Sequence, residues 1–419
     1  MLIFRPLSAF SGGWSAVGFT LSLVVPSFAI VDRFLGVSGV VAYGAIASLM
    51  LLFVHRQFFE RLVPAMTRKG VVGLAGGLVA FLVIAFLVGY PLANSGLLGP
   101  GSDRDEHLSL GAAELLHGRY PYYLTGPMGA VISQMPGALI LGAPFVLLGN
   151  GGYQNLFWLM MFVATVSWFL RDLRPALLLL VVMLSLAPVI LREYVTGGDL
   201  LANSIYVLLF VMGMVHFIPQ DNLGTWKKVL LAVALGVGLS SRAQFVLLLP
   251  LVFSALTHRT GPRAATAYVA TTCMTFGLVT VPFYLYDPGR FSPLATVGYV
   301  QFESLPPFGS TLLVAAFVVA SVLCAMDGAN SDMSALMRRC TVVLAIPIVS
   351  VTLFASFDSG AAEFYYLGYG LSFVVFGAVG FMPRVGGDVN ARLPRSTTAA
   401  EAPAACEPGC PSRPGRAHS

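Results

Sequence analysis

Acidic side chains are concentrated in one long polar stretch, residues 101–136, which separates two strongly apolar regions of the chain. Asp103, Asp105 and Glu106 stand close together near its start. An aspartate beside other acids can hold a pKa suited to taking a proton from an attacking hydroxyl group. We therefore predict that Asp105 is a catalytic base, with Asp103 and Glu106 as further catalytic candidates. An Asp-x-Asp pair can also bind a divalent cation, so Asp103 and Asp105 would be the ligands if Mg²⁺ or Mn²⁺ takes part; no other cofactor is predicted.

The residues that follow these acids predict a short amphipathic helix. Leu108, Ala112, Leu115 and Leu116 have the spacing of one helical face within residues 106–117. A helix of this kind would lie along a membrane surface and hold the acids at the edge of the water. The alternative interpretation is an acidic turn in water that caps the helix, because aspartate is favoured at N-caps.

Two arginines farther along the chain are candidates for binding an anion. Arg192 stands in the sequence LREYVTGGDL, which also contains Asp199, and Arg242 stands where two apolar runs meet with almost no loop. A guanidinium group holds phosphate through charge-assisted hydrogen bonds. We predict that Arg192 and Arg242 bind a lipid phosphate and that Asp199 orients Arg192 or the substrate. The alternatives are an Arg–Asp pair that closes a loop and an arginine whose head reaches the membrane surface.

Three tyrosines in the polar stretch could stack on a sugar ring: Tyr120, Tyr122 and Tyr123. Tyrosines at a membrane interface are more often anchors, so this alternative stays open.

The composition indicates a membrane protein. Of 419 residues, 57% are hydrophobic and 10% are charged, and the mean hydropathy is +0.82. Repeated apolar runs approach the roughly 20 residues that cross a bilayer as a helix. The net charge of +5 does not indicate nucleic-acid binding, because the basic residues stand singly or in pairs at the ends of apolar runs.

The apolar runs predict an all-α bundle of about twelve transmembrane spans within residues 1–383. The predicted spans are Trp14–Val31, Val37–Val54, Val71–Tyr90, Tyr153–Leu170, Ala176–Leu191, Leu200–Phe217, Val229–Leu239, Ala243–Leu256, Ala264–Tyr286, Thr311–Met326, Thr341–Ala355 and Phe364–Phe381. Residues 137–149 are too short to cross and are predicted to lie along the outer leaflet. The polar tail, residues 384–419, is predicted to be disordered.

The distribution of basic residues predicts the orientation in the plasma membrane. With both termini in the cytoplasm, all but six of the 24 Lys and Arg residues face the cytoplasm. This asymmetry is what the positive-inside rule requires, and it places the loop of residues 101–149 on the extracytoplasmic side. The six outer residues are Arg33, Arg104, Arg119, Arg192, Arg242 and Arg290.

The polar stretch resembles the first outer loop of the GT-C class of membrane glycosyltransferases. The resemblance rests on residues in this order: Asp105-Glu106, Ala113, Leu115, Leu116, Gly118, Pro121, Tyr122 and Gln134-Met135-Pro136-Gly137. The Pro-Pro element of the class is reduced here to Met135-Pro136, its usual preceding basic residue is Gln134, and two additional predicted spans precede the loop.

The resemblance implies a fold, a reaction and residue roles. Members of the class take a sugar from a polyprenyl-phosphate donor outside the cytoplasm. Asp105 is similar to the catalytic acid that activates or positions the acceptor, and Arg192 and Arg242 to donor-phosphate contacts. By the same resemblance, Asp199, Tyr122 and Gln134 would bind substrate.

The predicted function is therefore inverting transfer of a sugar to a glycan, lipid or protein of the cell envelope. The predicted partners are the lipid-linked donor, that acceptor and membrane lipids, and not nucleic acid. A lipid or glycan transporter or flippase is one alternative, although the charges lie at span ends and no internal repeat is visible. A non-catalytic scaffold subunit with the same fold is the other.

Overall fold

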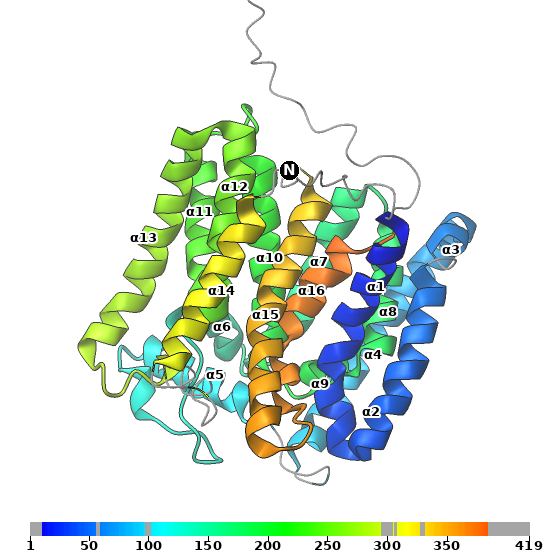
Figure 1. Ribbon diagram of the computed structural model, residues 1–419, viewed down its shortest axis with the longest axis horizontal. Helices are drawn as coiled ribbons and strands as arrows, with labels where there is room; N and C mark the ends of the chain where they lie inside the picture. The colour runs from blue at the N-terminus through cyan, green and yellow to red at the C-terminus, as the bar shows by residue number, and fades with distance from the viewer. Residues whose placement is uncertain are drawn as a thin grey trace, which may run out of the picture. The chain divides into compact units, whose positions relative to one another are not determined.

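The computed structural model describes residues 11–55, 59–95, 97, 102–294, 305, 308–326 and 332–383. These residues form a bundle of helices (Figure 1). Across the described ranges the β contact is one isolated bridge between Thr125 and Val131. The predicted tail of residues 384–419 and the first residue of the predicted loop, Gly101, lie outside the described residues.

The helices are those of a multi-pass membrane protein by length and composition, as predicted. Within the described residues eight segments are long and apolar enough to span, or up to nine if one bent pair counts as a span. They are Gly13–Phe53, Arg68–Asn94, Tyr153–Leu170, Asp199–Phe217, Ala243–Thr260, Pro262–Tyr286, Gly309–Met326 and Met333–Ser359, with the bent pair Leu173–Leu186 and Pro188–Val195.

Fewer than the predicted twelve spans are found among the described residues, and the reason differs from one apolar segment to the next. The run 229–239 belongs to α11 (Thr225–Leu239), which has 15 residues. The run 364–381 divides into η8 (Tyr365–Tyr369) and α16 (Leu371–Gly380), which has 10 residues. Hydropathy reports that a segment is apolar, but it does not report whether one helix continues through it.

The segment Gly13–Phe53 folds back on itself, so its two legs correspond to the first two predicted spans. It comprises α1 (Ser11–Val24), η2 (Val25–Ser27) and α2 (Phe28–Phe53). Gly36 has a φ of 64° and interrupts the helical backbone of α2. The rings of Phe28 and Tyr43 are 6.3 Å apart, whereas fifteen residues of straight helix would separate them by about 22 Å. Glycine permits this reversal because it has no Cβ to clash at positive φ.

The predicted span 176–191 is broken rather than straight. It comprises α8 (Leu173–Leu186) and α9 (Pro188–Val195), which meet at 88°. Pro188 cannot donate a backbone hydrogen bond to the preceding turn, and Ala187 leaves the helical conformation with a φ of −128° and a ψ of 77°. As a result, α9 turns toward α4 (Arg68–Asn94), and a Cβ on Gly89 of α4 would meet the Val195 side chain at 2.9 Å.

The predicted polar loop folds as a helical layer at one end of the bundle. It contains α5 (Arg104–Leu116), η4 (Pro121–Tyr123) and α6 (Pro136–Leu147), the teal segments at the lower end in Figure 1. The helices α5 and α6 pack closely, since a Cβ on Gly111 would lie 2.9 Å from Leu139. The expected apolar face is buried at Leu108 and Ala112, whereas Leu116 is exposed.

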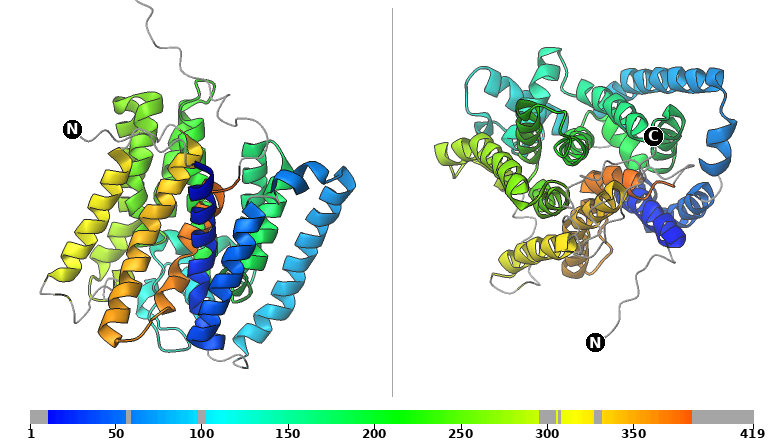
Figure 2. Two further views of the ribbon diagram at one scale, coloured as in Figure 1. Left: turned by 45° about the vertical axis from the view of Figure 1, so that its right-hand side comes forward. Right: turned by 90° about the horizontal axis from the view of Figure 1, so that it is seen from above.

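The helix α10 (Asp199–Phe217) has most of its side chains buried, and seven further helical segments complete the bundle. They are α3 (Phe59–Ala65), α7 (Tyr153–Leu170), η5 (Ala243–Leu248), α12 (Leu249–Thr260), α13 (Pro262–Tyr286), α14 (Gly309–Met326) and α15 (Met333–Ser359). Figure 2 shows the long helices side by side, with α5 and α6 gathered at one end. The core is therefore one continuous apolar cluster around α10, with a smaller cluster around α5 and α6.

Basic residues gather at the end of the bundle opposite α5. The helix α3 and the turn that joins α12 to α13 lie at that end (Figure 1). Arg61 belongs to α3, Arg68 begins α4, and Arg259 and Arg263 flank the α12–α13 turn. Which end of the bundle faces the cytoplasm stays a prediction.

Candidate functional site

Asp105 lies in the first turn of α5 and is buried, with 1% of its surface exposed. Its Oδ2 accepts a 2.6 Å hydrogen bond from the hydroxyl of Tyr90 on α4. Its Oδ1 is buried and has no hydrogen-bond partner among the described residues. The prediction of acids at the water edge and the alternative of a solvated turn are therefore both wrong for Asp105, because the fold of α4, α5 and the turn before α10 encloses it.

Burial makes ionisation of Asp105 costly. The pKa of Asp105 is raised from 3.8 to about 8, first by burial and then by the neighbouring Glu106 carboxyl group. The hydrogen bond from Tyr90 acts in the opposite direction, because it favours the carboxylate. A base with a pKa near neutrality can both hold and release a proton under ordinary conditions.

The other two predicted catalytic acids have different surroundings. The Asp103 carboxylate lies 3.3 Å from Nε2 of His107, one helical turn away. Asp103 occupies the N-cap position of α5 but makes no side-chain capping hydrogen bond. Glu106 has a buried Oε2 without a hydrogen-bond partner among the described residues. Of these two acids, Glu106 is thus the one with an uncommitted oxygen.

Arg104, the residue before Asp105, joins α5 to two later parts of the chain. Its Nη1 donates a 3.0 Å hydrogen bond to Glu193 on α9, and its guanidinium lies 4.7 Å from the ring centroid of Tyr369 in η8. Burial opposes the charge of Arg104, but Glu193 outweighs it, so the pKa of Arg104 is raised. Because Glu193 is buried and Arg104 is mostly covered, this ion pair fixes the start of α5 against α9.

Asp199 and Arg242 form a second buried ion pair. Nη2 of Arg242 lies 2.7 Å from each carboxylate oxygen of Asp199, which is fully buried. Asn203 donates a 2.7 Å hydrogen bond to Asp199 Oδ2, and Gln134 Nε2 lies 3.4 Å from Oδ1. The same Gln134 nitrogen donates to the carbonyl of Arg104 at 2.9 Å. Three predicted site residues are thereby linked to the residue that precedes Asp105.

A Gly-Gly turn between α9 and α10 packs against two acids, Asp105 and Glu193. Gly197 has a φ of 72°, and a Cβ there would lie 2.9 Å from Tyr90 and 3.1 Å from Asp105. A Cβ on Gly198 would overlap the carboxylate of Glu193, which also accepts a 3.0 Å hydrogen bond from the Leu200 backbone. The turn must consist of glycine because neither the backbone angle of Gly197 nor the space at Gly198 admits a side chain.

Arg192, predicted to bind phosphate with Arg242, is placed differently. It is half-buried on α9, and its side chain makes no hydrogen bond or ion pair with any described residue. It lies close enough to Arg104 and Arg33 for their charges to act on it, with Glu193 as the balancing acid. Arg242 is paired with Asp199 through Nη2, although its buried Nε has no hydrogen-bond partner among the described residues. Arg192 retains its donors for a ligand.

Tyr122, predicted to bind substrate, is buried. Its hydroxyl donates a 3.0 Å hydrogen bond to the carbonyl of Gln134. Its neighbour Tyr123 is 52% exposed. The fold thus uses Tyr122 to hold the polar layer together, and it presents Tyr123 to the exterior.

A divalent cation finds no three-ligand site in the described part of the chain. No group of three His, Cys, Asp or Glu side chains with metal-ligating geometry occurs among these residues. Asp103 faces His107, and Asp105 binds Tyr90, so this donor set does not fit a protein-built metal centre.

Sequence reasoning missed three residues of the site: Tyr90, Arg104 and Glu193. Glu193 offered a signal, because an acid in a largely apolar run needs a buried partner. Tyr90 offered none, since a tyrosine at the end of a span is ordinarily an interfacial anchor.

Comparisons of this chain with family models, with curated proteins and with solved structures find no match. Its function has to be inferred from its own residues and their geometry.

Proposed function

We propose that this protein is a membrane glycosyltransferase that moves a sugar from a polyprenyl-phosphate donor to an acceptor hydroxyl group, with inversion at the anomeric carbon. The observation that carries the proposal is the buried Asp105 carboxyl group, which has a pKa of about 8 and one oxygen that no described residue hydrogen-bonds. Strongly perturbed acids of this kind concentrate at catalytic sites. The resemblance of residues 105–137 to the first outer loop of GT-C enzymes supplies the reaction class.

In the proposed reaction, the Asp105 carboxylate takes the proton of the acceptor hydroxyl while that oxygen attacks the anomeric carbon. The bond from this carbon to the donor phosphate oxygen breaks, and its electron pair leaves with the lipid phosphate. Negative charge that develops on the phosphate is stabilised by fixed positive charge. Arg192 is the proposed source of that charge, since the guanidinium of Arg242 already binds Asp199.

An apolar groove supports a donor with a long apolar tail. It has a volume of about 720 Å³ and is lined by apolar side chains of α4 from Val71 to Ile84, with Leu173 of α8. Tyr90 lies six residues farther along the same helix, about 9 Å at the helical rise, and it binds Asp105. A tail lying along α4 would therefore direct its phosphate toward the polar layer, near α9.

The predicted orientation belongs to the same proposal. The basic end of the bundle would face the cytoplasm, and the layer of α5 and α6 would face the exterior of the plasma membrane, where polyprenyl-linked sugars are used.

The test is transfer by purified protein given radiolabelled polyprenyl-phosphate sugars and an extract of cell-envelope acceptors. Asp105→Asn should lower transfer by about 10²- to 10⁴-fold, the usual contribution of a general base. Glu114→Gln is the matched control, because it alters a carboxylate on the same helix that is bound by Arg119 and lies away from the site.

Equal transfer by Asp105→Asn and the wild-type protein would overturn the assignment. Movement of labelled lipid across liposomes without any sugar transfer would identify a transporter or flippase instead. If cells require the protein and Asp105→Asn supports them as well as the wild-type protein does, the protein is a scaffold.

A further inference from the structure

An aromatic cluster lies beside the polar layer, where η4 meets the end of α13. The ring centroid of Tyr120 is 4.8 Å from that of Tyr123, 5.0 Å from that of Tyr286 and 5.4 Å from that of Tyr122. Tyr123 is 52% exposed and Tyr286 is 69% exposed. The cluster therefore has a buried side, at Tyr122, and an exposed side.

The hydroxyl groups of two of these tyrosines are bonded to the end of α13 and the residue that follows it, Tyr120 in a partly buried setting and Tyr123 at the surface. Tyr120 donates to the carbonyls of Phe283 and Asp287, at 3.0 and 3.2 Å. The Tyr123 hydroxyl donates to Asp287 Oδ2 at 3.2 Å. A tyrosine that anchors a protein at a membrane surface directs its polar end to headgroups and water. Here the Tyr123 hydroxyl is instead hydrogen-bonded to Asp287, and the Tyr123 ring is exposed.

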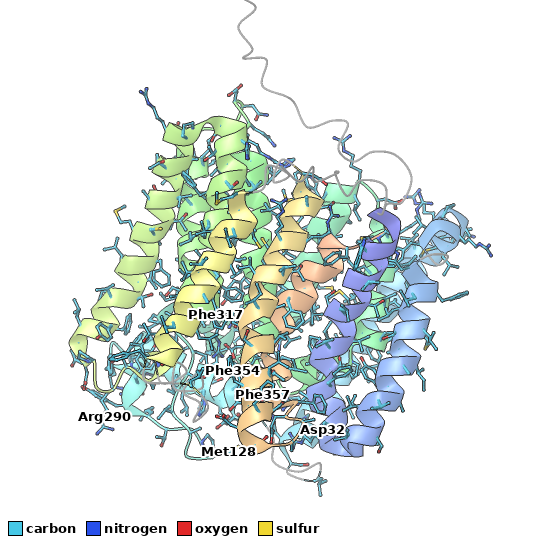
Figure 3. All side chains as sticks on the ribbon, viewed as in Figure 1. Asp32, Met128, Arg290, Phe317, Phe354 and Phe357 are labelled. Carbon is cyan, nitrogen blue, oxygen red and sulfur yellow. The ribbon has the colours of Figure 1, made fainter. Side chains whose placement is uncertain are left out.

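Asp287 adds hydrogen-bonding capacity beside the rings. Its Oδ1 accepts the Arg290 backbone N–H at 3.1 Å, and its Oδ2 accepts the Tyr123 hydroxyl. A carboxylate has about four acceptor positions, so it can take further hydrogen bonds from a ligand. Figure 3 shows Arg290 projecting outward at the same end of the bundle as Met128 of the polar layer.

The cluster connects directly to the candidate site. Tyr122 donates to the Gln134 carbonyl at 3.0 Å, and the Gln134 side chain binds the carbonyl of Arg104. Gln134 thus links Tyr122, on the buried side of the aromatic cluster, to the residue that precedes Asp105. A molecule seated on the rings would thus contact a part of the polar layer that is hydrogen-bonded to the start of α5.

We propose that Tyr120, Tyr123, Tyr286 and Asp287 form a stacking surface for the acceptor, and that the acceptor is an oligosaccharide. This inference rests on the proposed function and names its acceptor class. The C–H face of a pyranose or furanose ring is apolar with a partial positive charge, which suits the negative face of an aromatic ring. Its hydroxyl groups at the ring edge are donors for the Asp287 carboxylate. Rings and a carboxylate placed together therefore match a sugar better than a lipid chain.

The test measures binding rather than transfer. Purified full-length protein in detergent is applied to an array of defined mannan, arabinan, galactan and glucan oligosaccharides, and Kd is then determined for those that bind. Tyr286→Ala should weaken binding by at least about threefold, and Tyr123→Ala with Tyr286→Ala by about tenfold or more, as loss of ring stacking implies. Tyr286→Phe keeps the ring and should bind like the wild-type protein.

Asp105→Asn separates this inference from the proposed function. In the Asp105→Asn background, Tyr286→Ala should still weaken oligosaccharide binding by at least about threefold, because the contribution of the rings does not depend on the acceptor proton. Failure of the transfer experiment together with ring-dependent binding would remove the transferase and keep the sugar surface. Ring variants that bind every oligosaccharide as the wild-type protein does, or a wild-type protein that binds none, would overturn the inference.

A membrane-anchoring role is tested in lipid nanodiscs with brominated acyl chains. The fluorescence that Tyr286→Trp adds to the wild-type emission should escape quenching if position 286 faces a water-borne sugar. Strong quenching of that added emission would place the ring among the acyl chains and overturn the sugar surface.

Discussion

Asp105 and Asp199 are both buried aspartates at the same end of the bundle, yet their surroundings are opposite. Asp199 is bound by Arg242 through both oxygens and receives a further hydrogen bond from Asn203. Asp105 receives one hydrogen bond, from Tyr90, and keeps one oxygen without a partner among the described residues.

The difference teaches how one polar layer can serve two purposes. A buried carboxylate whose charge is balanced and whose oxygens are all bonded holds elements together, but it has no capacity to take a proton. A buried carboxyl group without a balancing cation shifts its pKa upward and stays available for proton transfer. Asp199 therefore positions the site, and Asp105 is the group suited to chemistry.

The largest effect should come from breaking the balanced pair. Asp199→Ala leaves the buried Arg242 guanidinium without its partner, so the free energy of unfolding should fall by about 3–5 kcal/mol. Denaturant unfolding of the detergent-solubilised protein measures this. The double variant Asp199→Leu with Arg242→Met should recover most of the loss, because it removes both charges. Equal stability of Asp199→Ala and the wild-type protein would show that the pair is not buried in solution.

The second effect is the pH dependence of stability that Asp105 imposes. Its pKa is raised from 3.8 to about 8 on folding, so the folded chain binds more protons than the unfolded chain between those values. The stabilising contribution of the protonated group is complete below about pH 4 and is lost as pH rises through about 8. Asp105→Asn cannot ionise, and its unfolding temperature should exceed that of the wild-type protein increasingly across this window. Parallel curves for the two proteins would contradict the raised pKa.

A smaller effect is expected from the one hydrogen bond that Asp105 receives. Tyr90→Phe removes the donor that favours the carboxylate, so the pKa of Asp105 should rise further. In a plot of the rate of sugar transfer against pH, the rising limb should therefore move to higher pH, with little change in the maximal rate. Tyr43→Phe, which removes a hydroxyl bonded to the Leu186 carbonyl away from Asp105, serves as the control and should leave the limb in place.

The smallest effect should come from an ion pair that water already surrounds. Arg119 binds Glu114 on the exposed side of α5, and 60% of the arginine side chain is exposed. Arg119→Ala should change neither stability nor transfer measurably, because exposed pairs contribute little. A large loss of transfer in this variant would mean that the reaction centre extends over the outer face of α5.

The sequence predicted the helical class, most of the long spans and the polar layer, because these depend on local patterns. The apolar run 153–170 is the helix Tyr153–Leu170 in the structure, and the short connection predicted at Arg242 lies between α11, which ends at Leu239, and η5, which begins at Ala243. The sequence also selected Asp105, Asp199 and Arg242. It could not predict which of these residues are partners, since residues 199 and 242 are joined only by the packing of separate helices.

What the sequence determined by itself is where apolar runs and polar residues fall, and therefore that this chain forms helices, several of them long and apolar enough to cross a membrane, with charges gathered at helix ends. Tertiary structure decided the break at Pro188, the reversal at Gly36 and the contrast between a balanced Asp199 and an unbalanced Asp105. The physical reason is that burial and charge pairing depend on residues distant in the chain. The pKa of a carboxyl group is set by those spatial neighbours rather than by the adjacent residues in the sequence.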